Sequence, residues 1–472
     1  METQHHRLPM PTVELEREKL LERVFQEGGF AYVNLAVRAA SGEAQAAEAA
    51  REIAWEQLHS GPWHSVRHVW RDAYAMSCLH VAEIHWSMGE VREALRALDM
   101  GIIMGGALLR KDLDAAVKAL VGDRFGFEGS SGEQEGLEGG LGGGAVACAG
   151  SRSRAEEVLQ LLPSKSLSCK KIDKRSDLSL EGFLCNYFLP GSPVIISGAI
   201  SHWPAMKRWK SMEYLKRIAG DRTVPVEVGK NYLAPGWKQE LISFSEFLDR
   251  IYSSDNGPNG LTYLAQHPVF DQILPLRQDI DVPDYCAASV GELKSLNAWF
   301  GPSGTVTPLH HDPHHNLFAQ VVGRKYVRLY PSSISNDLYP YEESMLHNSS
   351  RVDLDNPDPD EFPLAQDLDF MDCILEEGEM LYIPPKWWHY DTAQNETLLS
   401  FKKDEIRFAQ INIHGRLFGT MSDSIFEIGS NPNNRCITGL SKLQPQREKR
   451  DVADIFWTGV LLWLHSGVGL RV

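Results

Sequence analysis

Composition and charge restrict the functional classes open to this chain. Its 472 residues include 63 acidic and 47 basic side chains, which gives a net charge of −16 at pH 7. Such acidity argues against sequence-independent binding to nucleic acid phosphates, so we expect no direct contact with DNA or RNA. It suits a basic protein substrate such as a histone tail or an arginine- or lysine-rich peptide, and it is also a plain solubility device. The 43% of hydrophobic residues suffices for packed cores, and the length allows about two to four domains.

Cysteine use and apolar runs bear on the compartment. The seven cysteines are scattered and form no Cys-x-x-Cys pair, a pattern typical of a reducing compartment. We find no apolar run of signal-peptide or membrane-spanning length, so we expect neither secretion nor a membrane partner. The basic pairs Lys170-Lys171 and Lys174-Arg175 are either a nuclear import signal or solvated surface.

Residues 1–121 are predicted to form a helical domain. Apolar residues such as Leu20, Leu21, Val24 and Phe25 recur at helical spacing. The paired helices resemble tetratricopeptide-type repeats, without the clean period of about 34 residues. Such a domain either docks a protein partner or caps the domain that follows. Further helices are expected over 32–40, 43–58, 66–88, 91–104 and 111–121.

The composition changes sharply over residues 122–154. The stretch from Gly129 to Gly144 is mostly Gly, Ser and Glu, which cannot bury enough apolar surface to hold one conformation. We interpret 122–154 as a flexible linker between two domains. An insertion peculiar to this gene product is the alternative.

Residues 155–401 are predicted to form a second, β-rich domain. Short strand candidates alternate with Gly and Pro turns, which favours a sandwich or barrel. Helices are expected over 156–162, 178–187, 214–219 and 244–252. The strand candidates span 193–197, 223–228, 261–265, 296–300, 306–310, 317–322, 326–330 and 380–383.

One strand candidate carries a metal-binding pattern. Side chains alternate faces along a strand, so His310 and Asp312 project together while His311 points away. His389, just beyond a short apolar strand, offers a third ligand. Two imidazoles and one carboxylate form the facial set that favours iron(II) and leaves positions open for substrate and oxygen.

Polar side chains converge near this motif. Lys325 shares a strand face with apolar neighbours, where a lysine needs an anionic partner. A snorkelling lysine at a sheet edge is the alternative. Asn316 and Gln320 share a face beside Phe318, as polar groups do in ligand pockets.

Five longer motifs support a family assignment. They are Tyr263-Leu-Ala-Gln-His267, Asn297-Ala-Trp-Phe-Gly-Pro302, Thr307-Pro-Leu-His-x-Asp312-Pro, Gly323-Arg-Lys-Tyr326 and Tyr382-Ile-Pro-Pro-Lys-Trp-Trp-His389. Together they resemble the JmjC-domain 2-oxoglutarate oxygenases, and within them the plant form of the lysine demethylase 8 group. The resemblance implies an α+β chain, in which a double-stranded β-helix (a cupin-like jelly roll) follows the helical domain.

The resemblance also implies the site residues and co-substrates. Fe(II) would be bound by His310, Asp312 and His389, with O2 and 2-oxoglutarate as co-substrates. Lys325, Thr307, Tyr263 and Asn316 would hold 2-oxoglutarate, with Lys325 on its distal carboxylate. Strict alternation places Thr307 opposite His310, so Thr307 joins only if Pro308 bulges the strand.

On the substrate side, the resemblance implies a lining formed by Glu227 and Trp299. An outward strand carboxylate and a core aromatic are the alternative interpretations of these two residues.

The chain departs from the family after His389-Tyr390. The family continues with an alternating strand that ends in a Ser-x-Ser-Phe-Trp-Trp-like sequence, whereas this chain has Asp391 to Phe401 and a tail over 402–472. Either Leu398 to Phe401 replace part of that strand or the barrel keeps an unpaired edge. We interpret the tail as an alternative transcript end that contributes little to activity.

Three functions are therefore open. The first is a dioxygenase of protein side chains, either a methyl-lysine demethylase of histone H3 or a protein (arginyl) hydroxylase. For it, the resemblance implies transcriptional and circadian regulation in the nucleus, with the cytoplasm as a second location. The second is a JmjC binding protein impaired by its altered strand. The third is a cupin-type zinc or manganese protein that adds His314 to His310, Asp312 and His389.

Overall fold

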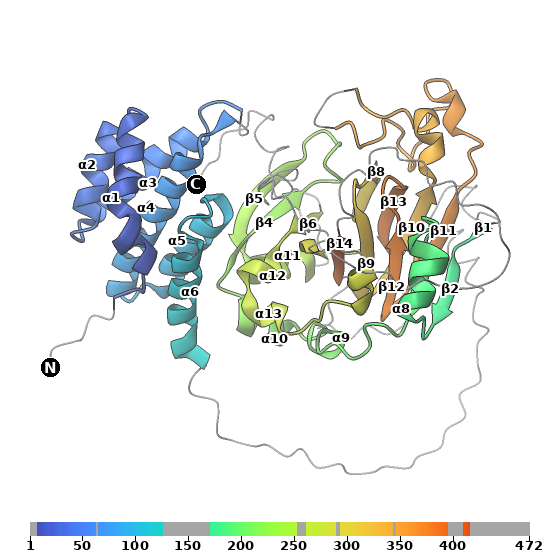
Figure 1. Cartoon of the computed structure of the whole chain (residues 1–472), viewed down its shortest axis with the longest axis horizontal. Helices are drawn as coiled ribbons and strands as arrows, with labels where there is room; N and C mark the ends of the chain where they lie inside the picture. Colours follow the sequence, from blue (N-terminus) through green and yellow to red (C-terminus); the bar gives the residue numbers. More distant parts are fainter. Residues whose placement is uncertain are drawn as a thin grey trace, which may run out of the picture.

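The helical and β-rich parts of the chain lie side by side. The computed structural model describes residues 7–62, 65–125, 170–252, 261–288, 293–342, 346–394 and 409–415. Within these ranges, no helix is long and apolar enough to cross a membrane. Figure 1 shows the helices of the first part in blue, next to two sheets with shorter helices around them.

The first part is organised around one buried helix, α4. Its side chains from Val69 to Ala82 are buried, and each of the other helices of this part contacts it. On α3, the alanines at 46, 47, 50 and 54 are buried, and their small side chains allow close helix packing. These elements are α1 (Pro11–Gln26), α2 (Phe30–Ala39), α3 (Ala44–Leu58), α4 (His68–Ser87), α5 (Val91–Met104) and α6 (Arg110–Phe125).

The second part contains a five-stranded and a nine-stranded sheet. The smaller has the order β1-β11-β10-β13-β8, and the larger β2-β3-β12-β9-β14-β7-β6-β4-β5. The strands are β1 (Lys170–Lys171), β2 (Asp173–Ser176), β3 (Val194–Ser197), β4 (Thr223–Val228), β5 (Lys238–Ser243), β6 (Thr262–His267), β7 (Leu293–Phe300), β8 (Val306–His311), β9 (His315–Val322), β10 (Arg324–Tyr330), β11 (Met371–Leu375), β12 (Glu379–Ile383), β13 (Trp388–Gln394) and β14 (Ala409–Gly415).

Apolar layers hold these sheets in place. Phe318 and Leu381 of the larger sheet share a core with Val327 and Leu329 of the smaller, so the two sheets face each other. The other face of the larger sheet packs on short helices and turns. The helical elements of this part are α8 (Leu180–Phe183), η2 (Leu184–Phe188), α9 (Ala205–Arg208), α10 (Met212–Ala219), α11 (Phe244–Tyr252), α12 (Val269–Gln272), α13 (Leu274–Arg277), η3 (Asp284–Ala288), η4 (Ser332–Leu338) and η5 (Pro363–Ala365).

The predicted fold class is confirmed, with several strands added. The α+β organisation, the helical first part and the cupin-like sandwich all agree with the sequence. The strands β1, β2, β5, β11 and β13 were not predicted. On β2 every side chain is exposed, so no apolar alternation marks it. Most of the predicted linker and the helix over 156–162 lie outside the described residues.

The last strand differs from expectation. Leu398 to Phe401 lie outside the described residues, whereas Ala409–Gly415 forms β14, which pairs with β7 on one side and β9 on the other. A strand from the segment expected to be a tail therefore lies inside the larger sheet, and this sheet extends past the predicted limit at residue 401.

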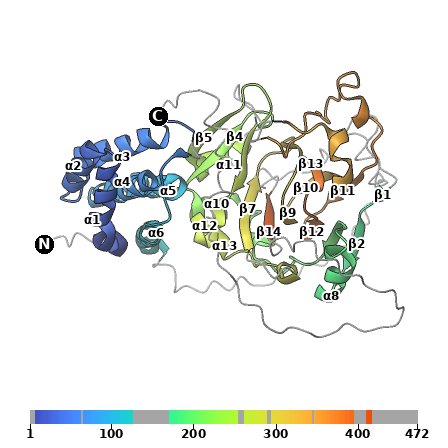
Figure 2. The ribbon, with the colours of Figure 1, turned by 45° about the horizontal axis from the view of Figure 1, so that its top comes forward.

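A buried ion pair joins the two parts of the chain. Figure 2 shows α5 next to β4, and Asp99 of α5 accepts a 2.6 Å hydrogen bond from Arg222, just before β4. Asp99 also accepts hydrogen bonds from the Thr223 backbone at 2.7 Å and from Gln272 at 2.7 Å. Both members of the pair are buried. The carboxylate therefore fixes the helical part to the start of β4.

We predict that Asp99→Asn destabilises the protein strongly, because it leaves the Arg222 charge buried without compensation. Breaking one side of a buried pair costs about 3–5 kcal/mol of unfolding free energy. The control, Arg92→Ala, removes the pair between Arg92 and Asp221, in which Arg92 is 81% exposed. That change should cost about 1 kcal/mol or less. Chemical denaturation measures the free energy of unfolding of both variants. Equal losses would contradict the assignment of Asp99 and Arg222 to a buried pair that stabilises the fold.

Candidate metal centre and adjoining pocket

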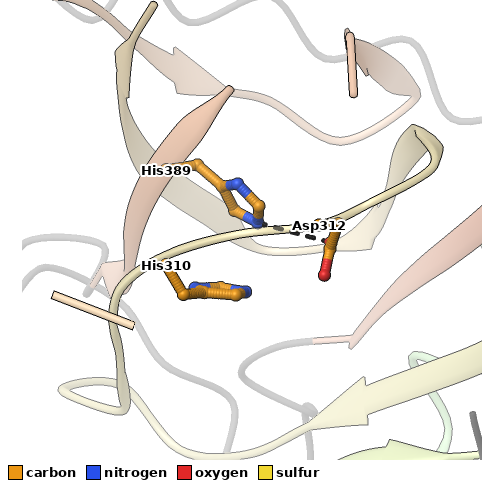
Figure 3. Close-up of side chains that lie close together, drawn as sticks. All are labelled: His310, Asp312 and His389. Atoms are coloured by element: carbon orange, nitrogen blue, oxygen red, sulfur yellow. Dashed lines mark ion pairs between the residues drawn. The ribbon is translucent and has the colours of Figure 1, made fainter. Parts of the chain in front are cut away.

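Two strands bring the three predicted metal ligands together. In the antiparallel pair of β8 and β13, His389 lies directly opposite His310. Asp312 follows β8 by one residue and lies beside both imidazoles, as Figure 3 shows. The ligand atoms of the three side chains all lie within 4.8 Å of one another. Among the described residues, no other group of this kind could hold a metal ion.

The tautomers of both histidines suit metal binding. The Nδ1 atom of His310 donates to the Pro308 carbonyl at 2.8 Å, and that of His389 donates to the Trp387 carbonyl at 3.2 Å. Because a carbonyl oxygen only accepts, each Nε2 is left unprotonated in the neutral ring. Burial lowers the pKa of His389 to about 4, so this ring is neutral at pH 7. Neutral imidazoles are the form that binds metal ions.

One buried atom indicates that a ligand belongs here. The Nε2 atom of His389 is buried without a hydrogen-bond partner, and it lies 3.7 Å from the nearest oxygen of Asp312. Leaving such an acceptor unsatisfied is costly unless something else binds it. Asn316 donates to the same Asp312 carboxylate at 3.0 Å and so orients it. The residues present therefore fit a metal ion held by two imidazoles and one carboxylate.

The neighbouring histidines take other roles. His311 packs edge-on against Trp388, with ring centroids 4.7 Å apart, as strand alternation predicts. His315 contacts the Tyr382 hydroxyl at 2.7 Å through Nδ1. His314 is not part of the candidate metal cluster. The structure thus gives no support to a site with His314 as a fourth ligand.

A bulge turns Thr307 toward the buried side chains of Lys325, Asp391 and Tyr263, a group that we name the pocket. The β8–β13 register shifts between His389, which pairs with His310, and Asp391, which pairs with Thr307. Two residues of β8, Pro308 and Leu309, therefore oppose one residue of β13. This is the bulge on which the inclusion of Thr307 depended. Its hydroxyl donates to the Asp391 carboxylate at 3.0 Å.

Lys325 is a fully buried cation rather than a snorkelling lysine. Its side chain on β10 is 1% exposed and forms an ion pair with Asp391 of β13, which is 2% exposed. Burial lowers the pKa of Lys325, and Asp391 opposes that effect. The Lys325 ammonium also lies 6.0 Å from the centre of the Phe318 ring. Lys325 therefore offers a cation that is shielded from solvent to an anion beside it.

Aromatic residues form another side of the pocket. Tyr263 of β6 and Trp299 of β7 pack together with Ala393 of β13. Burial raises the pKa of Tyr263 well above its usual range, and the charge of Asp391 adds to the rise. The Tyr263 hydroxyl approaches Thr307 without forming a regular hydrogen bond. Tyr263 thus presents a buried hydroxyl next to the Lys325–Asp391 pair.

A carboxyl group adjoins this side of the pocket. On β4, Glu227 lies opposite Tyr263 of β6, and Trp237 donates to its carboxylate at 3.2 Å. Burial raises the pKa of Glu227 to about 7. Tyr232 has a raised pKa because of burial and the nearby charges of Glu227, Asp312 and Asp391, so it lies among them. Glu227 is therefore not a simple outward-facing carboxylate.

Three pocket residues were missed from the sequence. Asp391 lies two residues after His389, so strand alternation alone could have placed the two on one face. Tyr232 and Trp237 come from the connection between β4 and β5, and no periodic pattern marks such residues.

We predict that His389→Ala and Asp312→Ala each abolish tight binding of Mn(II) or Fe(II), because two ligands remain. The control is His311→Ala. His311 lies next to His310 on β8 but faces away from the cluster, so this variant should keep the metal. Elemental analysis after anaerobic loading measures the stoichiometry. Retained metal in Asp312→Ala, or its loss in His311→Ala, would contradict this site.

The chain is similar to known proteins over both of its parts. A family model of KDM8-like N-terminal ARM repeats matches residues 10–133, and a model of the cupin-like domain matches residues 180–402. The helical repeats are thus of the ARM type, and their predicted likeness to tetratricopeptide repeats was wrong.

Three related proteins match between 44% and 81% of this chain. Lysine-specific demethylase JMJ30 of Arabidopsis thaliana is 59% identical over 401 residues, which cover 81% of this chain and 91% of that protein. Lysine-specific demethylase 8 of Xenopus tropicalis is 39% identical over 72% of this chain and 84% of its own length. The human bifunctional peptidase and (3S)-lysyl hydroxylase JMJD7 is 27% identical over 44% of this chain and 75% of its own. The chain therefore belongs to the JmjC-domain 2-oxoglutarate oxygenases, in the lysine demethylase 8 group.

Proposed function

We propose that this protein uses Fe(II), 2-oxoglutarate and O2 to oxidise a basic side chain of a protein, with a methyl-lysine of histone H3 as substrate. The observation that carries the proposal is the cluster of His310, Asp312 and His389, with the Nε2 atom of His389 buried and unsatisfied. This donor set is typical of iron(II) oxygenases. The family membership supports the same assignment.

The proposed roles follow from the contacts of each residue. His310, Asp312 and His389 hold Fe(II), which when bound supplies the activation of O2. Asn316 orients Asp312 through its 3.0 Å hydrogen bond. Lys325, Thr307 and Tyr263 surround a buried carboxylate in this structure, that of Asp391, so their chemistry suits the distal carboxylate of 2-oxoglutarate. Phe318 packs edge-on against the His389 ring, with ring centroids 5.6 Å apart, and gives the centre an apolar side.

The substrate class follows from charge. Glu227 offers a shielded carboxylate next to Tyr263, and Trp299 offers an aromatic surface on the same side. A cationic lysine or arginine side chain is the natural partner of such a carboxylate. The net charge of −16 also favours a basic protein over a nucleic acid. Two relatives whose names specify lysine-specific demethylation favour methyl-lysine.

Hydroxylation of a lysyl or arginyl carbon is the second candidate. The match to a human protein named as a lysyl hydroxylase favours it, and Glu227 suits an unmethylated cation equally well. The pairing of β14 with β7 and β9 argues against a JmjC binding protein that is impaired by an open barrel. A histone substrate would place the protein in the nucleus, where transcriptional and circadian regulation are its proposed roles. The ARM-type helices offer a surface for a protein partner.

We predict that the full chain loaded with Fe(II) forms succinate from 2-oxoglutarate, and that methylated histone H3 peptides stimulate the turnover. Asp312→Ala should lower the rate by at least about a hundredfold, because the metal is lost. His311→Ala should retain most of the turnover rate. Mass spectrometry of the peptide distinguishes the two reactions, since demethylation removes a methylene mass and hydroxylation adds one oxygen. Iron-bound wild-type protein without turnover would contradict the proposal.

We predict that the affinity for a cationic peptide rises with pH around neutrality. The pKa of Glu227 is about 7, so its carboxyl is mostly neutral at pH 6 and charged at pH 8. The Michaelis constant should therefore fall by up to about tenfold across this range. Glu227→Gln should remove this dependence. The control is Glu240→Gln. Glu240 lies on the neighbouring strand β5 and pairs with Arg250, so this variant should keep the pH dependence. If the Michaelis constant of Glu227→Gln still fell with pH, the assignment of Glu227 to the substrate side would be contradicted.

A further inference from the structure

The pocket next to the metal cluster already contains an anion of the chain itself. Asp391 lies between β10 and β8, opposite Val327 on one side and Thr307 on the other. Its carboxylate pairs with Lys325 and accepts the hydrogen bond from Thr307 at 3.0 Å. Its charge also raises the pKa of Tyr263. Three of the four residues assigned to 2-oxoglutarate therefore gather around one internal carboxylate.

The position of Asp391 is fixed by the backbone. The residue belongs to β13, which pairs with strands on both sides, so its backbone is fixed in the sheet, and the contacts with Lys325 and Thr307 hold its carboxylate. Both Lys325 and Asp391 are almost fully buried, at 1% and 2% exposure. A second carboxylate brought to the same ammonium would add an uncompensated negative charge at a buried position. Such a charge is strongly disfavoured.

We propose that Asp391 occupies the subsite for the distal carboxylate of the 2-oxo acid and acts as an intramolecular competitor for Lys325. The inference rests on the proposed function, in which Lys325 receives that carboxylate. This chain then binds 2-oxoglutarate weakly and does not prefer it to a 2-oxo acid with an apolar tail. Asp391 is thus a residue that determines co-substrate specificity.

The test compares two acids on two proteins by calorimetry, with Mn(II) in place of Fe(II). The acids are 2-oxoglutarate and 2-oxopentanoate, which has a methyl group in place of the distal carboxylate. The wild-type chain should bind the two within about threefold of each other. Asp391→Asn keeps an oxygen for Thr307 but removes the charge. It should gain 2-oxoglutarate affinity by about 10- to 100-fold, the range of a charge-assisted hydrogen bond.

The control and a second readout separate charge from folding. Asp353→Asn removes a half-exposed carboxylate that pairs with Lys230, and it should leave both affinities unchanged. Asp391→Asn should also unfold at a lower temperature, because Lys325 loses an opposing charge, and 2-oxoglutarate should restore its stability more than 2-oxopentanoate does. If this variant does not fold, the comparison of the two acids on the wild-type chain decides alone.

Each outcome has a defined meaning. A wild-type preference for 2-oxoglutarate of about tenfold or more would overturn the inference and leave the proposed function intact. Unchanged affinities in a folded Asp391→Asn would do the same. A gain of at least about tenfold in 2-oxoglutarate affinity in Asp391→Asn, from a measurable affinity in the wild type, would support the inference. If both proteins bind Mn(II) but neither binds 2-oxoglutarate, the proposed co-substrate fails, and the inference falls with it.

Discussion

The pairing of β8 with β13 is the constraint on which the site depends. It places His389 opposite His310 and, through the bulge at Pro308 and Leu309, sets Thr307 opposite Asp391. A shift of this register by one residue would turn His389 to the other face of the sheet. The metal cluster and the anion pocket therefore depend on the same backbone hydrogen bonds. The larger sheet supplies Asn316 and Tyr263 from across the sandwich.

Buried charge gives the pocket its chemical character. Lys325 and Asp391 lie almost entirely out of water, next to a carboxylate and two imidazoles that are suited to a divalent metal. Interactions among such charges are strong, because little solvent screens them. A difference of one carboxylate would therefore change which anions bind beside Lys325. The proposed competition between Asp391 and a co-substrate follows from this balance, and so does the proposed role of Glu227 toward a cationic substrate.

Strand alternation and motif resemblance predicted the metal centre. The faces of His310, His311 and Asp312 follow from a period of two, and the structure confirms that these side chains separate as expected. The requirement for a bulge at Pro308 was also a consequence of alternation. The need of Lys325 for an anionic partner followed from its apolar strand face, although the identity of that partner did not.

Other features depend on contacts that a sequence does not display. Asp391 pairs with Lys325 only because β10 and β13 are neighbours, and that order is a property of the sheet. Tyr232 and Trp237 come from a connection without periodicity. The strand β14 lies in a segment that departs from the family pattern, so the resemblance could not place it. The ion pair between Asp99 and Arg222 joins residues far apart in the chain and had no sequence signal.

The most direct test of the metal centre is anomalous diffraction from crystals of the full chain grown anaerobically with Fe(II), with data collected at the iron absorption edge. The account predicts one strong peak bounded by the Nε2 atoms of His310 and His389 and the carboxylate of Asp312. A peak ligated by His314 or His315, or metal bound only elsewhere in a well-ordered crystal, would contradict it.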